Sequence, residues 1–171
     1  ISLPFFLQNT LGHSEVMTGL LLTPWPLATL FAAPAAGYLV ERIHPGILGS
    51  IGMGIFCIGL YSLSTLDAES SILSICLRLA VCGIGFGLFQ TPNNSTIIAS
   101  APTKRSGGAS GMLGMARLMG QTLGTTLVAL LFSWVVGSKS TEVCLIIGSV
   151  FALIAAIVSG LRLSQPSVLK E

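Results

Sequence analysis

The sequence predicts an all-α protein, a polytopic membrane helix bundle with five transmembrane helices. Only 8% of its residues are charged, against about 25% in an average soluble domain. About 20 mostly apolar residues are enough to cross the roughly 30 Å of bilayer hydrocarbon as a helix. Five stretches reach that length, at residues 16–41, 46–66, 72–101, 107–136 and 141–163. Backbone groups inside a bilayer must bond within their own segment, and residues 141–163 lack the alternation of a barrel strand, so helices are expected.

The beginning of the chain carries an interrupted helix. Residues 1–7 are apolar and are predicted to be the end of a preceding helix, so the chain is expected to be a fragment of a longer protein. In the first long stretch, Pro24 and Pro26 have no N–H to donate, which predicts a break in the helix. Trp25 lies between them and offers a flat π-face suited to an organic cation. Substrate contact and ordinary helix packing are both open for Trp25.

The third stretch carries an intramembrane polar segment. Pro92 predicts a kink, and helical winding places Gln90 and Asn94 on one face with neighbouring glycines. These amides either line a cavity, where they could bond Arg117 of the fourth stretch, or form ordinary interhelical bonds. Arg78, near the other end of the same stretch, is expected to reach the outer headgroup level.

The fourth stretch holds a charge near the middle of the membrane. Arg117 lies about ten residues into the predicted helix, roughly 15 Å deep at about 1.5 Å per residue. Helical winding places Gln121 and several small residues on the same face as Arg117, while methionines occupy the opposite face. Charges at such depth usually face a bundle interior or a cavity. Arg117 therefore either serves a cavity or locks the packing by bonding a neighbour's carbonyls.

Other kinds of chemistry are not supported by the sequence. The segment 108–111 has the GxSG spacing of an intramembrane serine protease, but His13 and His44 fall in connections on opposite sides of the membrane. The four cysteines lie inside apolar stretches without a CxxC pair. No basic run with interleaved aromatic residues is present. An enzyme, a cofactor, a metal site and a nucleic-acid partner are therefore not expected.

The connections predict the orientation of the helices. Basic residues gather on one side, which the positive-inside rule assigns to the cytoplasm together with the carboxy terminus. They are Arg42, Lys104, Arg105, Arg162 and Lys170. The other side carries Lys139 and four carboxylates, Glu15, Asp67, Glu69 and Glu142.

Two segments carry a resemblance to a known family. The connection after the first stretch, residues 37–46, resembles the G-x-L-a-D-R-x-G loop of the major facilitator superfamily, with Glu41 in place of Asp and departures at 44–46. The segments 85–94, 105–111 and 116–124 resemble the EmrB/QacA type of fourteen-span drug:proton antiporters, with the SmvA-like methyl viologen resistance branch the most similar. The chain would then supply the last five helices, most of the carboxy-terminal half.

The resemblance implies a function and a set of residues. It implies proton-coupled efflux of hydrophobic or cationic drugs, of the quaternary ammonium or viologen type, by alternating access in the bacterial inner (plasma) membrane. The partners would be the substrate, protons, the lipid bilayer and the missing amino-terminal half, which would carry the proton-binding carboxylates. The substrate-lining candidates are Trp25, Gln90, Asn94, Arg117 and Gln121, and the candidate gating residues are Gly37, Glu41 and Arg42. A carrier of another substrate and a non-transporting sensor or assembly subunit remain alternatives.

Overall fold

The computed structural model describes residues 2–67, 69–102, 106–135 and 139–161. Within these ranges every regular element is a helix, and five helical segments are long and apolar enough to cross a membrane. The predicted all-α membrane bundle is therefore confirmed. The elements are α1 (Ser2–Asn9), α2 (Glu15–Leu22), α3 (Pro24–Val40), α4 (Pro45–Ser64), α5 (Ile72–Ala99), α6 (Ser106–Trp134) and α7 (Lys139–Leu161).

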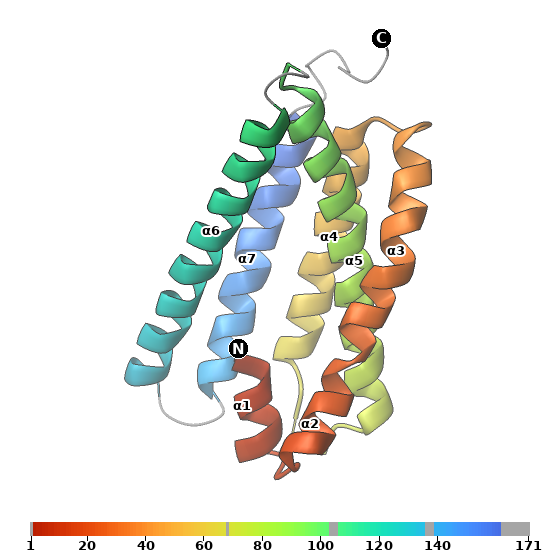
Figure 1. The fold of residues 1–171 in the computed structure, drawn as a ribbon. Coiled ribbons are helices and arrows are strands. Elements are labelled where there is room, and N and C mark those ends of the chain that lie inside the picture. Colours follow the sequence, from red (N-terminus) through yellow and green to blue (C-terminus); the bar gives the residue numbers. More distant parts are fainter. Residues whose placement is uncertain (1, 68, 103–105, 136–138, 162–171) are drawn as a thin grey trace.

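The long helices run side by side in alternating directions, so that their ends gather at two opposite ends of the bundle (Figure 1). The described residues of the α3–α4 connection, including Arg42, lie at one end. The α4–α5 connection and the start of α7, with Asp67 and Glu142, lie at the other. The remaining bases expected at the cytoplasmic end, Lys104, Arg105, Arg162 and Lys170, fall outside the described residues.

The predicted break of the first span is confirmed at Thr23, which separates α2 from α3. The N–H of Thr23 donates to the Leu20 carbonyl at 3.2 Å, and its hydroxyl donates to the Gly19 carbonyl at 3.0 Å. These two bonds replace part of the ladder that Pro24 and Pro26 cannot supply. By contrast, α5 continues as a helix through Pro92.

Glycines set the positions of α3 and α4 against α5. A Cβ on Gly85 would lie 2.5 Å from the Phe56 nitrogen and 2.7 Å from the Gly52 carbonyl oxygen, so α4 and α5 touch backbone to backbone. On the α3 side of α5, Gly83 contacts the Trp25 carbonyl, and a Cβ on Gly87 would lie 2.8 Å from that of Ala32. Small residues at membrane helix crossings allow this approach.

Arg78 has protein partners at the end of α4. Its guanidinium donates to the Ser62 carbonyl and, at 3.0 Å, to the hydroxyl of Thr65. A cation at a helix C-terminus stabilises the negative end of the helix dipole. The side chain that was expected to reach headgroups thus ties α5 to the last turn of α4.

The helix α6 differs from its neighbours in burial. None of its residues is buried against the rest of the described chain, whereas α4, α5 and α7 all contribute buried side chains to the core. Met112 is 75% exposed and Leu123 is 70% exposed. Both faces of α6, polar and apolar, are therefore open over most of its length.

Candidate substrate-binding site

The polar stripe of α6 is exposed. Arg117 and Gln121 are both open on the surface of the described bundle, and a Cβ on Gly114 or Gly124 would meet nothing within 4 Å. Within the described part of the chain, the Arg117 guanidinium bonds no carbonyl of a neighbouring helix. The stripe thus places a cation and an amide towards the middle of a helix that is long and apolar enough to cross a membrane, on a face that leaves room for a further partner.

The amides of α5 occupy a more enclosed position. Gln90 and Asn94 are both half-buried, on either side of the fully buried Pro92. The Thr91 hydroxyl lies 3.5 Å from the Ala33 carbonyl, a long contact between α5 and α3. Among the described residues, no hydrogen bond joins Gln90 or Asn94 to Arg117. The two polar groups belong to neighbouring helices but do not pair directly.

Trp25 belongs to an aromatic cluster (Trp25, Phe56 and Phe86) that joins α3, α4 and α5. The Trp25 and Phe56 ring centroids are 5.6 Å apart, with the planes at 82°, an edge-to-face arrangement. Phe86 lies 6.3 Å from Trp25 and 5.9 Å from Phe56. Such pairs contribute about 0.5–1.5 kcal/mol beyond area burial. Because Phe86 precedes Gln90 by one helical turn, the aromatic cluster lies next to the polar segment of α5.

Thr29 fixes the distance between Trp25 and α5. Its hydroxyl lies 3.0 Å from the Trp25 carbonyl and 3.1 Å from the Gly83 carbonyl, bridging the two helices. Gly83 itself has no side chain to hold α3 away. The position of Trp25 therefore depends on the α3–α5 contact as well as on its own ring packing.

The candidate gating residues lie at the end of α3: Gly37 is in its last turn, and Glu41 and Arg42 follow it. Arg42 stacks on the Tyr38 ring, with its Cζ 4.7 Å from the centroid, and donates a hydrogen bond to the Tyr38 hydroxyl. Glu41 and Arg42 are exposed, and a Cβ on Gly37 would meet nothing within 4 Å. The Arg42 side chain is thus held against its own helix, while the neighbouring Glu41 side chain is exposed.

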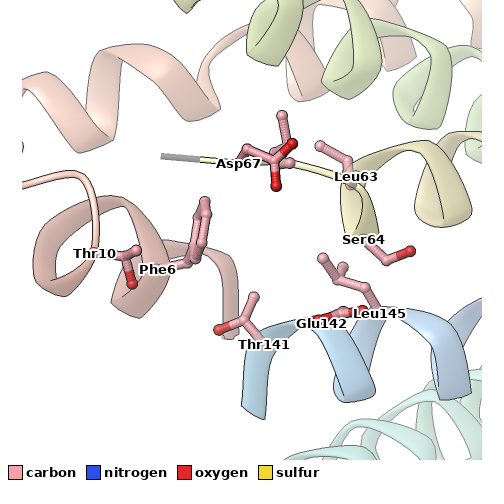
Figure 2. A pocket seen from close by; sticks show the side chains of 9 residues that line it. Phe6, Thr10, Leu63, Ser64, Asp67, Thr141, Glu142 and Leu145 are labelled. Atoms are coloured by element: carbon pink, nitrogen blue, oxygen red, sulfur yellow. The ribbon is translucent and has the colours of Figure 1, made fainter. Parts of the chain in front are cut away.

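A separate pocket lies at the opposite end of the bundle, between α1, α4 and α7 (Figure 2). Its volume is about 180 Å³, and Figure 2 shows Asp67 and Glu142 at its edges. The remaining lining is apolar or hydroxylic: Phe6, Thr10, Leu63, Ser64, Leu66, Thr141 and Leu145. None of the predicted substrate-lining residues reaches this pocket. In the described ranges, no group of three His, Cys, Asp or Glu could hold a metal ion.

Comparison with known proteins identifies the family. A sequence model of the "Major Facilitator Superfamily" matches residues 1–170. The chain belongs to this superfamily. Over 166 residues it is 58% identical to the "Uncharacterized transporter YebQ" of Escherichia coli (strain K12), covering 97% of this chain and 36% of that relative.

Two further major facilitator relatives have names that state a substrate class. The "Multidrug resistance protein Stp" of Mycobacterium tuberculosis is 33% identical over 130 residues, covering 75% of this chain and 24% of the relative. The "Riboflavin transporter RibZ" of Clostridioides difficile is 30% identical over 131 residues, covering 77% of this chain and 29% of the relative. The chain thus spans only part of their length. The family and these relatives are transporters, not enzymes.

Sequence reasoning missed two parts of this candidate site. Phe56 was not singled out, although it follows Gly52 by one helical turn and therefore shares the glycine face of α4. Thr29 was also missed, although it follows Trp25 by the same spacing. In both cases the local signal was the spacing from a residue already under consideration, since side chains one turn apart share a helix face.

Proposed function

We propose that this chain is part of the carboxy-terminal half of a transporter that exports hydrophobic or cationic small molecules in exchange for protons. The polar stripe of α6, with Arg117 and Gln121, carries this proposal because a charge at membrane depth is retained chiefly for function. The EmrB/QacA type, with the SmvA-like branch, is the corresponding subfamily. The setting would be a bacterial inner membrane, with the carboxy terminus in the cytoplasm.

The aromatic cluster and the α5 amides would supply the substrate surface of this half. An aromatic face attracts an organic cation, and amides such as Gln90 and Asn94 fix its orientation without a full charge. The remaining wall and the proton-carrying carboxylate would come from the other half of the transporter. Arg117, within about 4–6 Å of such a carboxylate, would lower its pKa and so link protonation to substrate release.

The proposal is tested by efflux of a fluorescent lipophilic cation from cells that express the complete transporter. We expect efflux above the background of empty cells, and we expect a protonophore to collapse it, because the proton gradient would be the energy source. Efflux that persists after the gradient is dissipated would contradict proton coupling. No efflux of several lipophilic cations from well-expressed protein would contradict the substrate class.

Replacement of Trp25 tests the aromatic surface. We expect Trp25→Ala to raise the apparent KM for an aromatic cation about three- to tenfold, because a cation–π contact contributes about 0.5–2 kcal/mol. Trp25→Phe keeps a π-face and should recover most of the affinity. Trp134→Ala is the matched control, since Trp134 is 78% exposed at the far end of α6. An unchanged KM in Trp25→Ala would mean that the Trp25 ring contributes to packing and not to substrate binding.

A second candidate substrate class follows from the relative named as a riboflavin transporter. A flavin is a flat aromatic molecule, so the aromatic cluster and the α5 amides could bind it by stacking and hydrogen bonds. Uptake or efflux of labelled riboflavin, measured beside the lipophilic cation, separates the two classes. Transport of riboflavin alone would favour this second function.

A further inference from the structure

Hydrogen bonds from α4 itself and from α7 meet at the start of α4. His44 precedes the helix, and its Nδ1 accepts the N–H of Gly46 at 3.1 Å. The Gly46 carbonyl in turn lies 2.9 Å from the Ser50 hydroxyl and 3.3 Å from the Ser159 hydroxyl of α7. Residues 44–46 are those that depart from the family loop pattern, and here they build the beginning of α4.

Glycines bring α4 and α7 close enough for these bonds. A Cβ on Gly49 would lie 2.6 Å from the Ser159 hydroxyl oxygen, and one on Gly46 would lie 3.1 Å from the Ser159 carbonyl oxygen. The Ser50 hydroxyl also lies 2.9 Å from the Ala156 carbonyl of α7. The two serines thus reach across the same contact from opposite helices.

The other side of the loop belongs to α3. The N–H groups of Arg42 and Ile43 both donate to the Leu39 carbonyl, at 3.0 and 2.8 Å. The next N–H groups in the ladder, from Ile47 and Leu48, donate to the His44 carbonyl instead. The backbone hydrogen bonds of Arg42 and Ile43 thus belong to the end of α3, and those of Ile47 and Leu48 belong to the start of α4. The change from one helix to the other falls between Ile43 and His44. Both α3 and α4 pack on α5 and only slightly on each other, but α4 also packs extensively on α7. The α4 side of the loop therefore has a support in α7 that the α3 side lacks.

We propose that Ser159 and Ser50 are positioning residues that hold the α4 side of this loop against α7 as an anchor. A hinge then lies at Ile43–His44, between the two sides. The segment with Glu41 and Arg42 would then move with α3, while α4 and α7 stay together. Its role in transport rests on the function proposed above, in which Glu41 and Arg42 act as a gate. The anchor itself does not depend on the substrate.

The anchor is tested by hydrogen–deuterium exchange of the complete transporter, followed in peptides that cover residues 44–50. We expect Ser159→Ala to speed exchange there about threefold, the effect of one typical interhelical hydrogen bond in a membrane bundle. Ser50→Ala combined with Ser159→Ala should speed it about tenfold, because the Gly46 carbonyl then loses both hydroxyl donors. Ser149→Ala is the matched control, since Ser149 is buried on α7 and its hydroxyl donates to the Ile146 carbonyl of its own helix.

The positioning role is tested by transport kinetics of the same variants. We expect the maximal efflux rate of Ser159→Ala to fall about threefold with the KM unchanged, because the loop would affect a conformational step rather than binding. Unchanged exchange in the double variant would overturn the anchor. Faster exchange with unchanged transport would overturn the positioning role. A wild type that exports no drug would refute the proposed function and the positioning role, while the exchange result would still decide the anchor.

Discussion

Arg117→Ala is expected to reduce efflux by the complete transporter about tenfold or more. In the proposed transporter Arg117 would pair with a buried carboxylate of the other half, and loss of one partner of such a pair costs about 2–5 kcal/mol. The protein should still reach the membrane at the wild-type level. The Arg117 guanidinium is exposed in the described bundle and bonds no described neighbour, so its removal leaves the packing of α3, α4, α5 and α7 unchanged. Efflux rate at matched membrane abundance is the measurement.

Two further variants of α6 test whether the loss of efflux is specific to the Arg117 guanidinium. Met115 is 67% exposed on the opposite face of the helix, so Met115→Ala should transport at nearly the wild-type rate. Arg117→Lys keeps the charge but loses the planar fork of donors, and should retain part of the activity. If Arg117→Ala instead lowers protein abundance and the remaining protein transports normally, the residue locks the assembly of the two halves and does not act in transport.

The helices of this fold were predictable because their signals are local. A run of about 20 apolar residues is sufficient to define a spanning helix, and a proline without an N–H is sufficient to predict the break at Thr23. The partner of each helix was not predictable in this way. Gly52 and Gly85 are far apart in the sequence, and nothing in either segment states that their backbones touch.

The candidate site, too, could be predicted from the sequence only where the signal is local to one helix. Helical winding identified the polar face of α5 and the polar stripe of α6, since both follow from spacing alone. It suggested a direct bond between Gln90 or Asn94 and Arg117, which the described structure does not contain. Depth along two neighbouring helices can be counted from sequence, but their rotation depends on contacts across the bundle. The partners of Arg78 at the end of α4 were missed for that reason.

The contact of Gly85 with α4 gives the largest expected loss of stability. A Cβ in Gly85→Ala would lie 2.5 Å from the Phe56 nitrogen and 2.7 Å from the Gly52 carbonyl oxygen, and both atoms belong to backbone that cannot rotate away. The helices must separate, and overpacking of this kind costs about 1–3 kcal/mol. We expect the apparent Tm of the purified complete transporter to fall by about 1–4 °C. Gly85→Val should be worse, because a second and third carbon must also be accommodated.

Gly54→Ala separates this effect from the loss of a glycine as such. Gly54 lies on the same α4 helix as Gly52, but a Cβ there would meet nothing within 4 Å. Because Ala is a better helix former than Gly by about 1 kcal/mol, this variant should keep the wild-type Tm or raise it slightly. A lower Tm in Gly85→Ala with none in Gly54→Ala would locate the sensitivity at the α4–α5 contact. Equal Tm values in both variants would mean that α4 and α5 are not in backbone contact at Gly85.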